Sequence, residues 1–249
     1  RGAVIHYHGL PITPDVVALE AIQGGHAFVS FAHPGQLGLA IAAAQSFALD
    51  NGAFSAWMSG QPVTDWSAYY EWVHSIARHA GCDFAVIPDC IDGSEADNDA
   101  LLAEWPHGKF LGVPVWHLHE SLGRLERVAA DYPRIALGSS GEFSSVGTPR
   151  WWNRMAEVMR VLCDDEGYPL VRIHGLRMLN PDVFGRLPFA SADSTNIGRN
   201  VGIDSHWKGT YTPPTKAARA ALMRARIESV NAPARWVHQA VQEDMCSLF

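Results

Sequence analysis

The sequence predicts an α/β protein with the (β/α)8 (TIM) barrel fold, built as a single domain that ends in a short helical tail. Three observations support this fold. Short apolar runs, typical of buried parallel strands, alternate with longer stretches of helical periodicity along about 200 residues. Eight such runs occur, which is the number of strands in this barrel. The glycine-rich GxGxxG turn of the main rival, a doubly wound open sheet, does not follow the first run.

The predicted strands and helices follow one another along the chain. The strands cover residues 3–7, 27–31, 46–49, 83–87, 111–116, 134–137, 170–173 and 189–192. The helices cover residues 14–22, 36–44, 65–79, 94–104, 121–130, 149–163 and 215–230. Ser94, Ser121 and Thr148 stand at helix starts, where a hydroxyl can cap free N–H groups, and Pro149 suits a first helical position. Residues 1–235 are therefore assigned to the barrel and residues 236–249 to the tail.

Composition is that of a globular enzyme. Of 249 residues, 47% are hydrophobic and 18% are charged, which is far from the composition of a disordered chain. No apolar run approaches the roughly 18–20 residues that a membrane helix needs. The chain shows no charged-then-apolar signal segment, so a cytoplasmic location is expected, or the host cytoplasm if the protein is phage-encoded. The four cysteines form no CxxC pair, which favours reduced thiols over a disulfide framework or a cysteine zinc site.

Charge is unevenly distributed. The net charge of −7 argues against general affinity for nucleic acid. Residues 199–235, however, carry seven basic and two acidic side chains, a local balance of +5. This segment is expected to contact a polyanion through Arg199, Lys208, Arg219 and Arg224, with a solvated helix face as the alternative.

Polar and titratable residues recur at the C-terminal ends of the predicted strands. They are His6, His8, His33, Asp50, Asn51, Asp89, His117, His119, Gly138, Ser139, Ser140, His174, Gly175, Asp193 and Ser194. In a (β/α)8 barrel the active site lies at this end of the strands. Asp50, Asp89 and Asp193 each end an apolar run as a carboxylate. The sequence therefore predicts one carboxylate-lined pocket.

Two chemistries can use these residues. The first needs two carboxylates in unlike environments: one attacks a sugar carbon, and the other, with a raised pKa, handles a proton on the leaving base. The second needs a metal ion. His6 and His8 are two residues apart on a strand, so both face one side and can bind one ion, with His117, His174 and Asp193 completing the shell. A pair of hydrogen-bonded barrel histidines is the structural alternative for His6 and His8.

Several short motifs resemble those of the tRNA-guanine transglycosylases. LDNGAFSAW resembles the family motif in which Asp, a small polar residue and Gly precede Phe, and FASADSTNIGRN resembles the nucleophile motif at the last strand. VIPDC stands where the family has the Asp that recognises the base, and IALGSSGE resembles its glycine-containing base-binding segment. The similarity spans roughly residues 5–202. Within the superfamily, the chain is most similar to the phage and bacterial branch that inserts 7-deazaguanines, queuosine-like bases, into DNA.

The resemblance implies roles for individual residues. Asp193 would be the nucleophile on C1′ of the sugar, with Ser191 and Ser194 orienting it, and Asp50 the general acid/base. Asp89 would bind the Watson–Crick edge of the base. Phe54 or Trp116 would stack on the ring, with core packing as the alternative for both and the favoured one for Trp116, which lies in a strand. The other implied substrate-binding residues are Asn51, His117, Gly138, Ser139, His174 and Ser194. The implied partners are DNA, or tRNA, and a free 7-deazaguanine base, without a cofactor or a membrane.

The chain also departs from the family pattern. The Cys/His zinc cluster that follows the nucleophile motif of the tRNA enzymes is absent, which favours DNA over tRNA. His117 stands where the family usually has Gln, and Asn51 replaces the usual Ser. The chain also lacks the insertions of the longer tRNA enzymes.

Two other functions stay open at the level of sequence. A metal-dependent amidohydrolase would use His6, His8, His117 and Asp193, although strand six then ends in Gly138-Ser139 rather than His and strand four supplies no bridging Lys. A barrel that only binds a nucleobase or an oligonucleotide is the non-enzymatic alternative.

Overall fold

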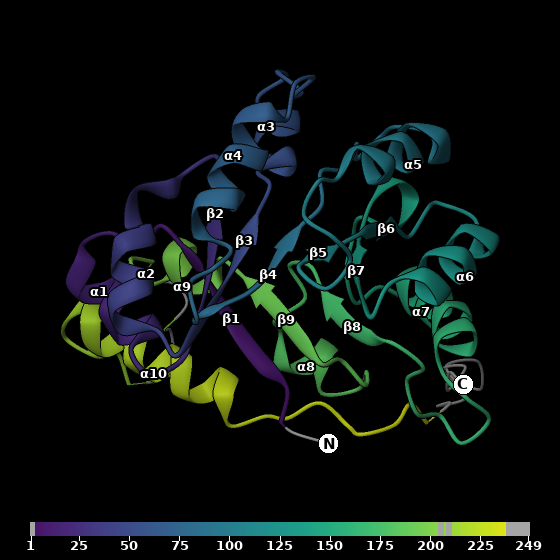
Figure 1. The fold of residues 1–249 in the computed structure, drawn as a ribbon. Coiled ribbons are helices and arrows are strands. Elements are labelled where there is room, and N and C mark those ends of the chain that lie inside the picture. The colour runs from purple at the N-terminus through teal and green to yellow at the C-terminus, as the bar shows by residue number, and fades with distance from the viewer. Residues whose placement is uncertain (1–2, 204–206, 208–210, 238–249) are drawn as a thin grey trace, which may run out of the picture.

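The computed structural model, which describes residues 3–203, 207 and 211–237, contains a nearly closed barrel of parallel strands with helices around it (Figure 1). The strands are β1 (Ile5–Leu10), β2 (His26–Ser30), β3 (Ser46–Asp50), β4 (Cys82–Val86), β5 (Gly112–Val113), β6 (Val115–His117), β7 (Arg134–Gly138), β8 (Arg172–Gly175) and β9 (Ser191–Ser194). Their order in the sheet is β5-β4-β3-β2-β1-β9-β8-β7-β6. The predicted (β/α)8 barrel is confirmed.

Proline explains why one predicted strand appears as two. Pro114 separates β5 from β6, and proline has no N–H to donate to a neighbouring strand. β5 pairs with β4, β6 pairs with β7, and the Ala136 N–H donates to the Pro114 carbonyl at 2.9 Å. The two ends of the sheet therefore meet at one residue, which brings the barrel close to closure.

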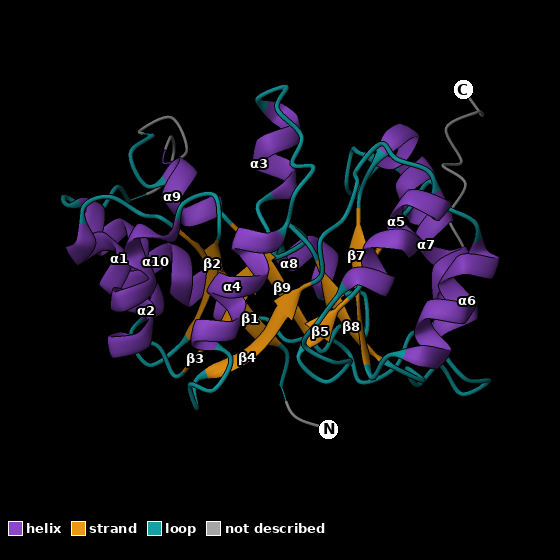
Figure 2. Ribbon diagram, turned by 45° about the horizontal axis from the view of Figure 1, so that its top comes forward, coloured by secondary structure: helices purple, strands orange, loops and turns teal. Residues whose placement is uncertain are grey.

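Most helices lie where the periodicity predicts them (Figure 2). They are α1 (Asp15–Ile22), α2 (Leu37–Ala43), α4 (Ser67–Ile76), α5 (Glu95–Glu104), α6 (Leu122–Asp131), α7 (Pro149–Leu162) and α10 (Lys216–Glu228). The predicted caps are confirmed, because the hydroxyls of Ser94, Ser121 and Thr148 each accept a bond from the N–H three residues on. Three short helices were not predicted, because they have too few turns to show a helical periodicity in the sequence: α3 (Ala53–Met58), α8 (Pro181–Phe184) and α9 (Asn196–Asn200).

Side chains on the strands alternate between the barrel interior and the helix layer. Tyr7, Phe28, Ala48, Val86 and Ala136 belong to one buried cluster inside the barrel. Their outward neighbours join the larger cluster under the helices, which includes Ala27, Leu49, Trp116, Leu137 and Ala192. Both faces of each strand are thus buried, as is usual for parallel sheets. Trp116 is part of this core and is fully buried under the helices.

A charged network lies at the N-terminal end of the barrel. Tyr7 donates its hydroxyl to Asp83 Oδ2 at 2.6 Å, and Arg134 donates two bonds to the same carboxylate at 2.9 and 3.1 Å. Burial acts to raise the pKa of Asp83, but the bonds from Arg134 and Tyr7 and the charge of Arg134 outweigh it, so the pKa lies below its usual range. This network and the rings above it fill the lower part of the barrel.

The chain after α10 crosses the N-terminal end of the barrel (Figure 1). Val4 N–H donates to Asn231 Oδ1 at 2.7 Å, and Trp236 N–H donates to the Gly167 carbonyl at 2.8 Å. Of the predicted tail, residues 238–249 lie outside the described residues. No helix in the described part of the chain has the length and apolar character needed to cross a membrane.

Candidate active site

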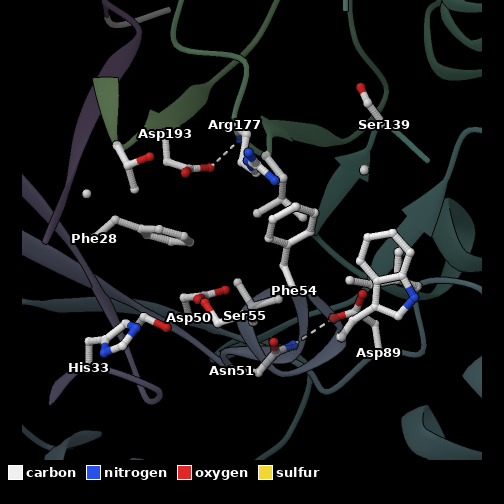
Figure 3. Close-up of a pocket in the computed structure, with 18 of the residues that line it drawn as sticks. Phe28, His33, Asp50, Asn51, Phe54, Ser55, Asp89, Ser139, Arg177 and Asp193 are labelled. Atoms are coloured by element: carbon white, nitrogen blue, oxygen red, sulfur yellow. Dashed lines mark hydrogen bonds between the residues drawn. The ribbon is translucent and has the colours of Figure 1, made fainter. Parts of the chain in front are cut away.

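A pocket of about 740 Å³ opens at the C-terminal ends of the strands. This is the size of a small-molecule site and the expected end of such a barrel. Ten residues from the sequence-based set line it: His33, Asp50, Asn51, Phe54, Asp89, His117, Gly138, Ser139, Asp193 and Arg199. The three predicted carboxylates are thus brought to one cavity, and Figure 3 shows them around its walls.

Asp193 is held by groups that the sequence does not indicate. Its Oδ1 accepts the backbone N–H of Arg177 at 2.8 Å and lies 3.3 Å from His174 Nε2. The predicted orienting hydroxyls act elsewhere, since Ser191 Oγ bonds His174 Nδ1 at 2.8 Å and Ser194 Oγ accepts the N–H of Asn196 at 2.9 Å. The prediction that Ser191 and Ser194 bond Asp193 directly is therefore wrong. Ser191 acts through His174 instead.

His174 and Ser194 do not line the pocket. His174 is fully buried in the barrel interior, where its ring lies against Tyr7, Phe28 and Phe84 at centroid distances of 5.1 to 6.0 Å. Its ring is therefore not exposed to a substrate in the pocket. Both residues had been expected to bind substrate. The structure makes His174 a support for Asp193 and gives Ser194 a bond within the turn after β9.

Asp50 lies in a different environment from Asp193. Burial raises the pKa of Asp50 to about 7, and the charges of Asp193 and Asp89 act in the same direction. The Gly52 N–H donates to Asp50 Oδ2 at 3.2 Å and opposes the shift. At neutral pH this carboxyl can therefore both give and take a proton, which is the property of a general acid/base.

A side chain lies at each oxygen of Asp89. Asn51 Nδ2 donates to Oδ1 at 2.8 Å, and His117 Nε2 lies 3.0 Å from Oδ2. Asn51 also donates to the Ile87 carbonyl and accepts the Ala53 N–H at 2.8 Å, so its amide is used within the protein. A carboxylate has about four acceptor positions, so Asp89 keeps capacity for a ligand. Asn51 acts by orienting Asp89 rather than by binding substrate through its own amide.

Gly138 and Ser139 line the pocket wall beside His117. A Cβ at Gly138 would lie 3.0 Å from His117 Nδ1, so glycine allows the two strands' ends to approach closely here. The Ser139 hydroxyl accepts the indole N–H of Trp151 at 2.9 Å. The side chain of Ser139 is therefore engaged, and its contribution to the pocket wall is mainly its backbone.

Arg177 is the main pocket residue that sequence reasoning missed. Its φ of 58° is the one positive value at a non-glycine position among the described residues. Its guanidinium carbon lies 3.8 Å from the centroid of the Phe54 ring. Burial lowers the pKa of Arg177, as does the charge of Arg199 nearby. The strand-end residues named from the sequence stop at Gly175, but the next two residues, Leu176 and Arg177, also line the pocket.

His6 and His8 point away from the pocket. His6 Nε2 lies 3.0 Å from the Val230 carbonyl, and His8 Nε2 lies 3.1 Å from Glu228 Oε1. Tyr7 between them faces the barrel interior. The ligand set His6, His8, His117 and Asp193 is therefore wrong, because two of its members lie on the helix side of β1 and two on the pocket side. Among the described residues, no three His, Cys, Asp or Glu side chains are grouped to hold a metal ion.

The basic residues divide between the pocket and the helix layer. Arg199, on α9, lines the pocket. Arg224 bonds the Gln23 carbonyl at 2.8 Å and Glu228 at 2.9 Å, and Arg219 bonds the Pro213 carbonyl at 3.0 Å. These bonds hold α10 at the end of α1 and hold the segment that precedes α10, so Arg219 and Arg224 have structural roles. Lys208 lies outside the described residues.

No family model matches the sequence, and no curated protein is similar to it. One solved chain, from Aquifex aeolicus VF5 and described only as a structural study, is similar in structure with a TM-score of 0.50. The two chains are 12% identical, with 92% of this chain and 94% of that chain covered. At this identity the similarity shows the barrel fold alone, and barrels of this kind support many unrelated activities.

Proposed function

We propose that the protein is a base-exchange transglycosylase, a glycosyltransferase that replaces guanine in nucleic acid, DNA rather than tRNA, with a 7-deazaguanine. The observation that carries the proposal is a set of three carboxylates, from the ends of three strands, in three environments around one pocket. Asp193 accepts the Arg177 N–H and lies beside His174, Asp50 has a pKa of about 7, and Asp89 accepts a bond from Asn51 and lies beside His117. Such differences let chemically identical groups take separate roles.

In the first half-reaction, a carboxylate oxygen of Asp193 attacks C1′ of the sugar. The C1′–O bond forms as the bond from C1′ to guanine N9 breaks, and the bonding electrons leave with guanine. Protonated Asp50 gives its proton to the departing base and becomes a carboxylate. The nucleic acid is then held as a covalent ester-like adduct on Asp193.

The second half-reaction runs in reverse with a different base. Asp50, now ionised, takes the N9 proton of the incoming 7-deazaguanine as that nitrogen attacks C1′. The bond to Asp193 breaks, which releases the carboxylate and restores protonated Asp50. One residue thus serves as acid and then as base, and its pKa near neutrality suits both steps.

Recognition of the base falls to Asp89, Phe54 and Arg177. The free acceptor positions of Asp89 suit the N–H groups on the Watson–Crick edge of a guanine-like base. Phe54 provides an aromatic face, and Arg177 lies against that face. Together with Arg199, Arg177 places positive charge at the pocket, which suits a substrate with phosphates.

The decisive experiment is exchange of labelled guanine into DNA duplexes and tRNA by the full chain, with trapping of the covalent adduct. Wild-type protein and substrate without an acceptor base are expected to give a denaturant-resistant adduct. Asp193→Asn is expected to give none and to slow exchange by roughly 10³-fold or more. Asp165→Asn, an exposed carboxylate in the turn before β8, is the matched control and is expected to behave as wild type.

Two results would contradict the proposal. The first is exchange by Asp193→Asn at close to the wild-type rate. The second is retention of nucleobase or oligonucleotide without exchange by the wild-type protein, which would favour a non-catalytic binding barrel.

A further inference from the structure

A short projection stands beside the pocket. It consists of α3 and the loop that follows, residues 53–63, and we call it the α3 finger. Figures 1 and 2 show α3 standing clear of the barrel at the C-terminal ends of the strands. Phe54, Ser55 and Trp57 on this finger line the pocket, so its inner side belongs to the site.

The outer part of the α3 finger exposes apolar side chains. Met58 is 64% exposed, Trp57 39% and Val63 37%. Exposure of large apolar side chains to water is unfavourable in free energy, so a group of them next to a pocket indicates a contact surface. Of the other strongly exposed apolar residues, Phe110 and Leu170 precede β5 and β8 and therefore lie at the opposite end of the barrel.

The base of the finger is firmly built. Gly52 has a φ of +81°, and a Cβ there would lie 3.0 Å from the Ala32 backbone nitrogen. Asn51 accepts the Ala53 N–H at 2.8 Å, and the same Asn51 holds Asp89. The position of the finger is thus coupled to the position of the base-recognition carboxylate.

A stack of side chains leads from the finger into the site. The Trp57 and Phe54 ring centroids are 5.8 Å apart, and the Arg177 guanidinium covers Phe54 at 3.8 Å. Among the described residues, neither Arg177 nor Arg199 makes an ion pair, so both cations are available to phosphates. Apolar tip, aromatic stack and cations therefore occur side by side on one rim of the pocket.

We propose that the α3 finger is a wedge for duplex DNA: Met58 and Trp57 enter the base stack where the target guanine is turned out into the pocket. The inference rests on the proposed function and names the form of its substrate. An enzyme that acts on a base must take it out of the duplex, and apolar side chains that fill or split a base step are one way to offset the cost of unstacking. Arg177 and Arg199 hold the phosphates on either side of the extruded nucleotide.

The test uses Met58→Ser, because Met58 does not line the pocket. Exchange is measured on a duplex, on the same strand alone, and on a duplex with an abasic site opposite the target. Met58→Ser is expected to slow exchange on the duplex by about tenfold, and to change it less than about twofold on the other two substrates, which are already unstacked. Phe110→Ser and Leu170→Ser, exposed apolar residues at the far end, are the controls and are expected to leave all three rates unchanged.

A second readout does not depend on chemistry. A duplex with 2-aminopurine beside the target guanine is titrated with Asp193→Asn, with and without Met58→Ser. Fluorescence is expected to rise on binding of the single variant and to stay low with the double variant. Equal loss of rate on all three substrates, or no rise in fluorescence with the single variant, overturns the wedge. Absence of exchange by wild type on every substrate, with the fluorescence response intact, overturns the proposed exchange reaction and leaves the wedge in place.

Discussion

Arg177 donates its backbone N–H to Asp193 Oδ1 at 2.8 Å, while its own side chain covers the Phe54 ring. One residue thus orients the proposed nucleophile with its backbone and the proposed stacking residue with its side chain. The two roles can be separated by substitution, because a backbone N–H survives any change except to proline.

Arg177→Gly and Arg177→Ala are expected to differ in stability and to agree in binding. Both keep the N–H to Asp193, so the rate of adduct formation at saturating DNA is expected to stay within about threefold of wild type. Both remove the guanidinium, so the KM for DNA is expected to rise about tenfold because one charged contact is lost. Glycine tolerates the φ of 58°, so Arg177→Gly is expected to be about 1 kcal/mol more stable than Arg177→Ala. Thermal unfolding and single-turnover kinetics measure both. A slowed adduct step in both variants would place the side chain in the chemistry.

The two half-reactions are expected to depend on pH in opposite directions. Adduct formation needs protonated Asp50 and is expected to fall as pH rises through about 7, whereas transfer from the adduct to the incoming base needs the ionised form and is expected to fall as pH drops through about 7. Rapid-quench measurements of each step between pH 5 and pH 9 provide the test. If the rates of both steps change with pH in the same direction, the assignment of Asp50 to both proton transfers is wrong.

Asp50→Asn is expected to stabilise the fold while it abolishes turnover. The pKa of this carboxyl is 3.8 in the unfolded chain and about 7 in the folded protein. Between about pH 4 and pH 7 the folded state therefore binds the proton and the unfolded state releases it. Stability therefore decreases as pH rises from about 4 to about 7, and the cost persists above that. The variant does not lose stability in this way, so its melting temperature at pH 8 is expected to exceed that of wild type. The increase is about 2–4 °C for each kcal/mol of unfolding free energy regained, and it is expected to shrink toward pH 4. Asp165→Asn should show no such pH-dependent gain.

Asn51→Ala is expected to weaken base recognition. The change removes the bond to Asp89 Oδ1 and leaves the Ile87 carbonyl and the Ala53 N–H without their partner, at a cost of about 1–3 kcal/mol in unfolding free energy. The KM for the incoming base is expected to rise more than kcat falls. Asn180→Ala, which removes the cap of α8, is a control for stability loss alone. Equal effects of both variants on the KM would mean that Asn51 acts only through stability.

Removal of divalent metals is expected to leave exchange unchanged. His6 and His8 bond the Val230 carbonyl and Glu228 on the helix side of β1, so they cannot join His117 and Asp193 around one ion. Activity before and after treatment with a chelator, together with the metal content of the purified protein, is the measurement. Loss of activity on chelation, restored by zinc, would contradict the carboxylate mechanism.

The apolar runs and the caps make most of this fold predictable, because strand bodies and helix starts depend on local chemistry. The faces of the strands are less predictable. In a barrel both faces are buried, so the sequence around β1 does not reveal that Tyr7 turns inward and His6 and His8 outward. The same uncertainty placed Trp116 among stacking candidates although it packs under the helices.

The carboxylates of the site were predictable because each ends an apolar run, and strand ends gather at one rim. The groups that hold them were not. His174 and the N–H of Arg177 reach Asp193 from a neighbouring strand and its loop, and that contact depends on the register between β8 and β9. Likewise, charge alone did not separate Arg199, at the pocket, from Arg219 and Arg224, whose bonds are made within the helix layer.

The filled lower part of the barrel sets the order of events in the proposed reaction. Beneath the pocket lie Phe28, Phe84 and His174 in contact with one another, and below them the carboxylate of Asp83 between Tyr7 and Arg134. A base therefore leaves by the opening through which its replacement enters, and the attached nucleic acid lies across that opening throughout. Guanine must depart before the new base arrives, so steady-state kinetics should be ping-pong, with free guanine competing against the incoming base for the adduct and not against the nucleic acid.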